Sequence, residues 1–548
     1  MNYFRKRIYN KLRDEMVTHV LLVAVVLVTF FPLVKLYYQQ DEWLGFGIFL
    51  TQGAKYLFSN VKSISGLILG EGRPANMLIH YFFFKYSPFS VVPAALFSIF
   101  FHSINAVLVY SLAKRLFKRS IPAMLGSLFF ILNSVSQSAV TWTAAAIGDL
   151  PSTTLILISL FYFLNYQDTR NKKDLFANFI LIYLSLFFKE TGIFLFVFVP
   201  LASLLFNKVS VDKFIRTFWH YILVAVVIVG YRVAELRAVE HEVALFLTGS
   251  SEFYLSSLIG RFIFYPLTSF SLTLVPSVAF LNFARAVTSV VYPFIPTEQF
   301  ILVAQTAVLD LLSIILTIAM LIVLSRLSKK ASLMQKKHLL FWILFVFSSF
   351  LPYIIISKNF AYLESRYYYL ASAGWAIIFS WIFFLLQTAK KKTIFVLSIM
   401  AFGFMLLSHY RAINNNLTET IQVADIRKGF LFQLSEIKPS LEDKRNVFFV
   451  SGDKDYYVEG NKVPFQSGFG QLLMVWYFDS GQIPKTLLEE GYLFELGSQG
   501  YRQIGDYGYG YFTEKELMEK TLFDYSEPPE VTELVYDSLS KKLILISD

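Results

Sequence analysis

The sequence contains no cysteine and few charged residues. None of its 548 residues is a cysteine, which excludes disulfide frameworks, thiolate metal sites, iron–sulfur clusters and thiol nucleophiles. Only 16% of the residues are charged, whereas soluble domains carry about 25%. Instead, 55% of the residues are hydrophobic, 18% are aromatic, and the mean hydropathy is +0.54. This composition is typical of a membrane protein and excludes a water-soluble enzyme of several domains.

The net charge of +10 is unevenly distributed along the chain. Residues 411–548 hold 14 Lys and Arg against 22 Asp and Glu, a balance of −8, whereas residues 1–410 hold 35 against 17, a balance of +18. The basic residues of the first part cluster in short loops, without the basic and aromatic stripe that binds nucleic acid. We therefore expect a membrane body over residues 1–410, an extracytoplasmic domain over residues 411–548, and no nucleic-acid partner.

Eleven apolar runs have the length and composition expected for crossing a hydrocarbon core of about 30 Å. They lie at 17–38, 90–113, 121–137, 149–166, 175–188, 192–206, 217–231, 300–325, 339–357, 367–388 and 393–410. The runs at 175–188 and 192–206 are short and also fit one broken helix. Residues 253–299 are apolar but contain several prolines, so we interpret them as interfacial or re-entrant helices.

The basic segments predict the orientation of these spans. Six segments hold 23 Lys and Arg residues, at 5–13, 114–119, 170–173, 208–216, 326–337 and 390–392. If eleven helices alternate from a cytoplasmic N-terminus, all six segments fall on the cytoplasmic side, as the positive-inside rule requires. The first run is too long for a removed signal peptide and lacks a small-residue cleavage site, so we expect an uncleaved anchor. The sequence thus predicts a multi-pass protein of a prokaryotic cytoplasmic membrane, with membrane lipids around it and its C-terminal domain outside.

The loops that are predicted to lie outside collect the unusual ionisable residues. Asp41 and Glu42 follow the first span directly, beside Trp43. Alone, such a pair is also typical of a solvated loop with an interfacial aromatic residue. The rest of this loop, which covers residues 39–89, and further external loops carry more charges: Arg73, Asp149, Lys189, Glu190, Glu364 and Arg366. Because ionisable groups at a membrane are costly, their collection on one face predicts a functional site.

The residue types at this face suggest its chemistry. Arginine and lysine suit a phosphate, and a carboxylate suits a proton acceptor for a hydroxyl nucleophile. His102 and Asn105 lie three residues apart within the second span. Polar residues at such positions commonly form interhelical hydrogen bonds, and the alternative is a ligand-binding role.

At these residues the chain resembles the GT-C superfamily of membrane glycosyltransferases. The first matching feature is the carboxylate pair Asp41-Glu42 in the first external loop. The similarity is greatest to the protein O-mannosyltransferases that carry tetratricopeptide repeats. Their motifs resemble four segments of this chain: Arg73-Pro74 through His102-x-x-Asn105-x-x-Leu108-x-Tyr110, Asp149-Leu150, Lys189-Glu190, and Glu364-Ser365-Arg366-Tyr367 with one residue inserted.

Two features depart from that family. Residues 133–138 replace a histidine-rich segment, and the tail lacks a helical repeat of about 34 residues. The sequence therefore gives no support for a protein acceptor that is bound by repeats. The sugar and the acceptor do not follow from the resemblance.

The resemblance implies an all-α polytopic fold and the transfer of a sugar from a dolichyl- or undecaprenyl-phosphate carrier. Mannose is one candidate sugar, and the acceptor is a hydroxyl of a glycan, lipid or protein on the outer face. Asp41 is then the catalytic base, and Glu42 orients the acceptor or pairs with a cation. The expected donor-binding residues are Arg73, Lys189, Glu190, Arg366, Asp149 and His102. We expect no cofactor and no metal ion, because a monophosphate leaving group needs none.

Two other function classes share some of these features. A transporter or lipid flippase has many spans, but it usually shows related halves and polar groups at the membrane midplane. A polysaccharide polymerase or ligase also has many spans and external Arg and His residues. The position of Asp41-Glu42 directly after the first span favours a GT-C glycosyltransferase.

The tail has the pattern of a small α/β domain. We expect helices at 417–434, 465–477 and 513–520, a buried strand at 446–451, and a terminal hairpin of 531–536 with 542–546. The Gly- and Tyr-rich run at 501–511 fits either a packed hairpin or a surface on which a sugar ring stacks.

Overall fold

The computed structural model describes residues 2–39, 41–59, 72–206, 210–238, 255–291, 298–356, 363–388, 392–441, 444–456, 462–465, 469–478 and 499–546. The chain divides into two compact units, and each is described by itself. The first unit combines residues 1–31, 68–73 and 97–415, and the second combines residues 32–67, 74–96 and 416–548. Three of the basic residues used for the orientation, Lys208, Lys390 and Lys391, lie outside the described residues.

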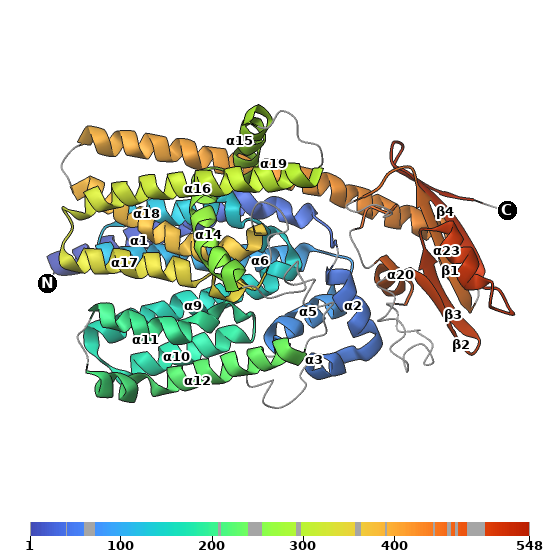
Figure 1. Ribbon diagram of the computed structural model, residues 1–548, viewed down its shortest axis with the longest axis horizontal. Coiled ribbons are helices and arrows are strands. Elements are labelled where there is room, and N and C mark those ends of the chain that lie inside the picture. The colour runs from blue at the N-terminus through green and yellow to red at the C-terminus, as the bar shows by residue number, and fades with distance from the viewer. Residues whose placement is uncertain are drawn as a thin grey trace. The chain divides into compact units, whose positions relative to one another are not determined.

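The first unit is a bundle of long helices, many of which run side by side in Figure 1. A helix overlaps each of the eleven predicted runs: α1 (Asn2–Phe30), α6 (Val92–Phe117), α7 (Ser120–Leu132), α9 (Thr143–Thr169), α10 (Lys172–Leu186), α11 (Leu195–Phe206), α12 (Val211–Ala238), α16 (Glu298–Ser328), α17 (Leu333–Ser348), α18 (Tyr369–Thr388) and α19 (Lys392–Ile437). Among the described residues, 6 helices are long and apolar enough to cross a membrane, or up to 7 with one bent pair. The mainly helical, multi-pass fold is confirmed, and the number of eleven spans stays a prediction.

Helices α9 and α10 form a hairpin that carries two of the predicted site segments. Asn178 of α10 donates to the carbonyl of Ser159 on α9 at 2.7 Å, and Tyr221 of α12 donates to Asn178 at 2.5 Å. Pro151 lies inside α9 and has no backbone N–H to donate to the preceding turn. Next to this proline, Asn105 of α6 donates to the carbonyl of Leu150 at 3.1 Å and so contributes to holding the first turns of α9 in place.

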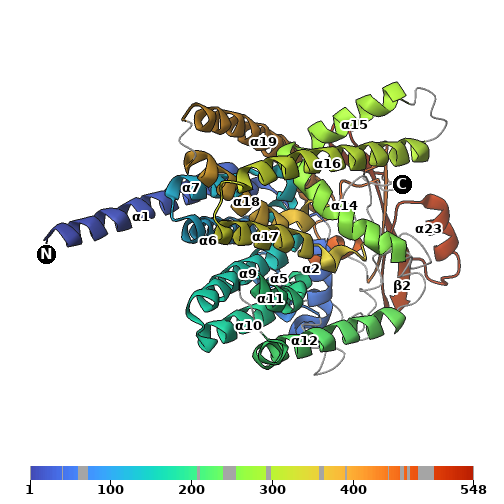
Figure 2. The same cartoon turned by 60° about the vertical axis from the view of Figure 1, so that its left-hand side comes forward.

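The proline-containing segment at 253–299 forms two apolar helices that meet at a sharp bend. α14 (Leu255–Leu274) and α15 (Ser277–Val291) are inclined by 105° across a short break, and Figure 2 shows the two helices diverging. Within the bundle, Tyr265 of α14 donates to the carbonyl of Ile356 at 2.5 Å, and Trp375 of α18 donates to Ser269 at 3.0 Å. This geometry is that of a broken span or a re-entrant loop, so whether the pair crosses the membrane stays a prediction.

The second unit is built around a five-stranded sheet in the order β2-β3-β1-β4-β5. Its strands are β1 (Arg445–Gly452), β2 (Gly500–Ile504), β3 (Tyr507–Phe512), β4 (Glu530–Asp537) and β5 (Lys542–Leu545). The central strand β1 is parallel to β3 and β4, whereas β2 and β5 are antiparallel to their neighbours. The small α/β tail is therefore confirmed, including its terminal hairpin.

The side chains of β1 alternate between the two faces of this sheet, and a helix packs on each face. Val447 and Phe449 pack with Met518 of α23 (Lys515–Leu522). On the other face, Phe448 stacks on Tyr477 of α20 (Phe469–Phe478). In the run at 501–511, β2 and β3 form a hairpin whose Tyr501 is 5% exposed, in agreement with the packed-hairpin alternative.

The second unit also contains most of the first external segment. That segment forms α2 (Asp41–Gln52), a 3₁₀ turn η2 (Gly53–Lys55), α3 (Tyr56–Ser59) and α5 (Pro74–Tyr86). The composition of the chain changes at Tyr410, but α19 continues through this residue to Ile437. Most of the first external loop, which we assigned to the membrane body, therefore folds with the C-terminal tail as one unit.

Candidate active site

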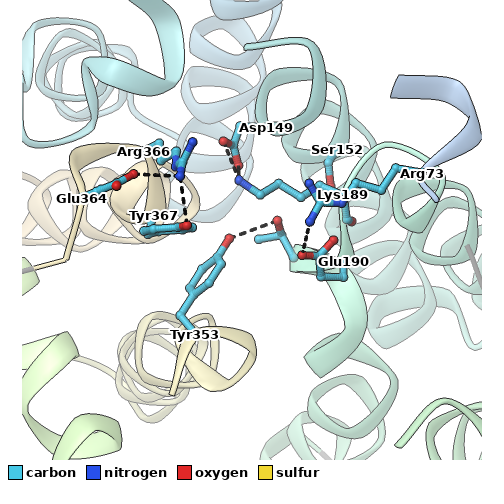
Figure 3. A network of polar contacts seen from close by, with 10 residues as sticks. Arg73, Asp149, Ser152, Lys189, Glu190, Tyr353, Glu364, Arg366 and Tyr367 are labelled. Carbon is cyan, nitrogen blue, oxygen red and sulfur yellow. Dashed lines mark hydrogen bonds and ion pairs between the residues drawn. The ribbon is translucent and has the colours of Figure 1, made fainter. Parts of the chain in front are cut away.

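The centre of the site in the first unit is an ion pair between Lys189 and Asp149. The Nζ atom of Lys189 lies 2.6 Å from Oδ1 and 2.7 Å from Oδ2 of Asp149. The two side chains are only 8% and 4% exposed. Figure 3 shows Lys189 extended towards Asp149, with Arg366 and Glu364 on one side and Arg73 and Glu190 on the other. A pair that uses both carboxylate oxygens, and that is shielded from water, ties α9 to the segment after α10.

The backbone around Lys189 explains how this side chain reaches α9. Lys189 is extended, with φ −161° and ψ 144°, between the end of α10 and the 3₁₀ turn η4 (Glu190–Phe194). Its N–H donates to the carbonyl of Ser185 at 3.0 Å. Gly192 packs so closely on Ser185 that a Cβ atom at this position would overlap the Ser185 hydroxyl. A glycine is therefore needed for the tight return of the chain after α10.

Arg73 and Glu190 form a second ion pair at 2.6 Å. These side chains are 45% and 32% exposed, so this pair is partly open to solvent, whereas the pair of Lys189 and Asp149 is buried. Arg73 has a φ of 47°, a left-handed conformation that residues other than glycine adopt infrequently. The preceding Gly72 has a φ of 71°. The chain is thus turned sharply just before α5, at the residue whose guanidinium meets Glu190.

Arg366 lies in a third ion pair, with Glu364 at 2.8 Å, in the 3₁₀ turn η6 (Ser365–Tyr368) before α18. Its guanidinium stacks over the ring of Trp142 at 4.4 Å and the ring of Tyr367 at 5.0 Å. The side chain is 20% exposed, and its Nε has no hydrogen-bond partner within the described part of the chain. Arg366 is therefore fixed in orientation by aromatic rings, and part of its side chain remains accessible.

Tyrosines connect these ion pairs. The Nζ of Lys189 lies 5.3 Å from the centre of the Tyr367 ring, and Tyr367 packs on Tyr353 with ring centres 4.7 Å apart. The hydroxyl groups of Tyr353 and Thr191 are 3.1 Å apart, which links this group to η4. We did not predict Trp142, Tyr353 and Thr191 as part of the site, because a lone aromatic or hydroxyl residue at a span end has no distinctive pattern.

The charges of the network shift the proton affinities of its members. The partial burial of Glu190 raises its pKa, but Arg73 and Lys189 outweigh this effect and lower the pKa to about 2. Glu190 in turn raises the pKa of Arg73. Burial lowers the pKa of Lys189, although Asp149 opposes this shift. Glu190 is therefore an anion at neutral pH and acts as a charge partner, not as an acid.

His102 belongs to a separate hydrogen-bond network between helices. Its Nδ1 lies 2.7 Å from the hydroxyl of Tyr369, which also accepts from Asn105 at 3.2 Å. Asn105 donates to the carbonyl of Leu150 at 3.1 Å and accepts from Thr154 at 2.7 Å. These bonds join α6, α9 and α18 next to Asp149 and Arg366. This geometry favours the interhelical role of His102 over binding of the donor.

Asp41 and Glu42 lie in the second unit, in the first turn of α2. Carboxylates at this position stabilise a helix through its dipole. Glu42 is only 1% exposed, and its Oε2 accepts from the backbone N–H of Gln39 at 3.3 Å. Asp41 is partly exposed. Of the two adjacent carboxylates, Asp41 is therefore the one that an acceptor could approach.

No group of three or more His, Asp or Glu side chains within the described ranges could hold a metal ion. The site residues of the first unit are instead arranged as cation–carboxylate pairs. The guanidinium groups of Arg73 and Arg366 are partly exposed in their pairs, and such groups can bind an anion such as a phosphate.

Comparisons with known proteins identify one family. Residues 74–232 match the family model described as "Dolichyl-phosphate-mannose-protein mannosyltransferase". This stretch contains His102, Asp149, Lys189 and Glu190. A search of curated proteins finds no match. The resemblance predicted from the sequence is confirmed: over residues 74–232 the chain is similar to the dolichyl-phosphate-mannose-protein mannosyltransferases, which supports a membrane glycosyltransferase of the GT-C kind.

Proposed function

We propose that this protein transfers a sugar from a polyprenyl-phosphate carrier to a hydroxyl acceptor on the outer face of the membrane. The carrier is a dolichyl- or undecaprenyl-phosphate, and the acceptor is a glycan, lipid or protein. The observation that carries the proposal is the network of Arg73, Lys189 and Arg366 with their carboxylates, because it gathers distant segments of a membrane protein into one cluster of ion pairs.

In this proposal, the two arginines bind the carrier phosphate. Arg73 is 45% exposed, and Arg366 is 20% exposed with an unpartnered Nε among the described residues. An arginine has several N–H groups and can hold a carboxylate and a phosphate at the same time. These groups would stabilise the negative charge that develops on the phosphate as the sugar leaves.

Lys189 and Asp149 support this site from within. Because each is almost fully buried and bonded to the other, neither is well placed to contact a carrier head group. Asp149 is also a poor candidate for the catalytic base, since both of its oxygens already bind Lys189. We assign the pair to holding η4, and with it Glu190 and Arg73, against α9.

Asp41 is the proposed catalytic base. It accepts the proton of the acceptor hydroxyl, whose oxygen forms a bond to the anomeric carbon of the sugar. The bond between that carbon and the phosphate oxygen breaks, and the polyprenyl phosphate leaves with the electron pair. General-base assistance of this kind is worth about 10² to 10⁴ in rate. The partial exposure of Asp41, against the burial of Glu42, supports this assignment.

The test measures sugar transfer by the purified protein in liposomes, with mannosyl-phosphoryl-polyprenol as the first donor and a set of glycan, lipid and peptide acceptors. Asp41→Asn preserves the shape of the side chain, so donor binding should persist while turnover falls by about 10² to 10⁴. Glu42→Gln should reduce turnover less. Normal turnover of Asp41→Asn would remove Asp41 as the base.

The same assay separates the other function classes. A transporter or flippase would move the labelled carrier between leaflets without forming a new glycosidic bond. A polysaccharide polymerase or ligase would require a glycan on a diphosphate carrier. Either result, with no transfer from the monophosphate donor, would contradict the proposed function.

A further inference from the structure

The helix that carries Asp41 packs against the C-terminal tail. The second unit joins residues 32–67 and 74–96 to residues 416–548, although more than three hundred residues separate them in the sequence. Gln471 of α20 lies against Gly47 of α2, where an added Cβ atom would meet the Cβ and Cγ of Gln471 at 2.9 Å. A glycine at position 47 therefore allows the two helices to approach closely.

Further contacts join the same two parts of the chain. The ring of Trp476 on α20 meets the edge of Phe89 with ring centres 5.0 Å apart, and Phe89 lies 6.2 Å from Trp43 on α2. Lys428 of α19 donates to the carbonyl of Lys35 at 2.6 Å. Trp43 and Phe46 of α2 are 0% exposed. The apolar side of α2 is thus buried within the second unit.

Helix α2 depends on this packing for its stability. It has 12 residues and contains both Gly45 and Gly47. Isolated helices shorter than about 12 to 15 residues are marginal in water even without glycine, and each glycine costs about 1 kcal/mol relative to alanine. Tertiary contacts must therefore hold α2 in its helical form.

We propose that the C-terminal tail, through Gln471 and α20, is the positioning element for α2 and so fixes the place of Asp41. Gly47 and Gln471 are positioning residues, since neither is assigned a contact with substrate. The contact itself is independent of the reaction, whereas its effect on turnover rests on the proposed role of Asp41.

The absence of cysteine allows a direct test of the contact in the full-length protein. Gly47→Cys combined with Gln471→Cys brings two thiols together. The two Cβ atoms would lie 2.9 Å apart without any movement, so a shift of about 1 Å gives the spacing of about 3.8 Å that a disulfide needs. Mild oxidation in membranes should form the bond, so that a maleimide polymer added after denaturation in SDS labels neither thiol. The control pair is Ala54→Cys with Gln471→Cys, because Ala54 is exposed beyond the end of α2. Both thiols of this pair should stay free and be labelled after denaturation. Failure of the first pair to cross-link would overturn the inference.

The effect on turnover is tested with Gly47→Leu, which forces α2 and α20 apart. A displacement of about 1 Å at a catalytic group can cost about 10²-fold in rate. We therefore expect kcat to fall by about that factor, while each protein molecule still binds one donor analogue. The matched control is Gly403→Leu on α19, where a Cβ would meet nothing within 4 Å.

The outcomes distinguish this inference from the proposed function. Normal turnover of Gly47→Leu would remove the positioning role. If Gly47→Leu loses donor binding as well, the substitution has damaged the fold. The cross-linking result then decides whether α20 holds α2. If the unchanged protein transfers no sugar from a polyprenyl phosphate, the proposed function fails, whereas the cysteine pair still reports whether the tail holds α2.

Discussion

Arg366 combines an ion pair, two aromatic contacts and a buried Nε that has no partner in the described part of the chain. Replacing it with alanine should raise the KM for the lipid-linked donor by roughly 10- to 100-fold, because charged hydrogen bonds are worth about 1.5–3 kcal/mol. Arg366→Lys should raise the KM less than Arg366→Ala does, because lysine keeps the charge. Lysine cannot stack on the aromatic rings or bind a phosphate bidentately, so the KM should stay above that of the unchanged protein. Steady-state kinetics with varied donor would measure both changes.

The control for Arg366 is Arg216, whose ion pair with Asp212 lies on one exposed helix face at 2.9 Å. Arg216→Ala should leave the KM for the donor unchanged, because exposed pairs of this type contribute little. Equal kinetics of the unchanged protein, Arg366→Ala and Arg366→Lys would exclude Arg366 from the donor site.

Substitutions in the buried pair of Lys189 and Asp149 should lower the stability of the folded protein. Lys189→Met or Asp149→Asn each leaves a buried group without its partner, which typically costs about 3–5 kcal/mol. The double variant removes both charges and should recover part of this loss. Thermal unfolding in detergent measures the effect, with Asp168→Asn as the control because Asp168 is 66% exposed in its pair with Arg115. Additive losses in the double variant would contradict a coupled buried pair.

At the scale of elements, the packing of α5 on α2 gives a pH dependence. His80 of α5 is 7% exposed and lies against Gly45 so closely that a Cβ there would overlap its ring. Burial lowers the pKa of His80 to about 4, although a hydrogen bond to the backbone of Glu42 opposes this shift. The histidine is therefore neutral in the folded unit at neutral pH.

The sign of the effect follows from proton binding. Between pH 6.5 and 4 the unfolded chain binds more protons at His80 than the folded chain, so the contribution of His80 to stability is complete above about pH 6.5 and is lost as the pH falls towards about 4. We expect the second unit to become more sensitive to protease between pH 7 and pH 5. His80→Gln should show a smaller change over this range. An identical change in both proteins would exclude His80 as the source.

The elements themselves were largely predictable, but their grouping was not. Apolar runs and alternating strands depend on neighbouring residues, so the helices of the bundle and the hairpin of β4 and β5 follow from local patterns. The contact of Gly47 with Gln471 joins residues far apart in the sequence, and nothing in either segment signals its partner. The continuation of α19 past Tyr410 was missed because the composition changes there while the helix does not end.

The candidate site shows the same limit. Asp149, Lys189, Glu190, Arg73 and Arg366 were predicted because charges at span ends are unusual, and the structure brings these five into one network. Trp142 was missed because its role depends on the guanidinium of a residue more than two hundred positions away. His102 was assigned to the site by resemblance, but its bonds to Tyr369 lie between helices.

For the molecule as a whole, the basic segments make a testable prediction of orientation. All six fall on the cytoplasmic side if eleven helices alternate, which places the residues after Tyr410 outside. A reporter that is active only outside the cytoplasm should therefore be active when it is fused after Asp548. A pair of reporters, one active on each side of the membrane, measures this in intact cells. A cytoplasmic signal would mean that one span has been miscounted, and the bent pair of α14 and α15 is then the first segment to re-examine.

The ion pairs of the first unit have a consequence for how the donor arrives. Arg73, Lys189 and Arg366 are each matched by one carboxylate, so their formal charges cancel. A neutral cluster produces little field at long range, and physiological salt already screens charges beyond about 8 Å. The carrier would therefore reach the site by lateral diffusion in the bilayer, without electrostatic steering. Initial rates of transfer should then vary little with ionic strength, in contrast to enzymes that attract a charged substrate from solution.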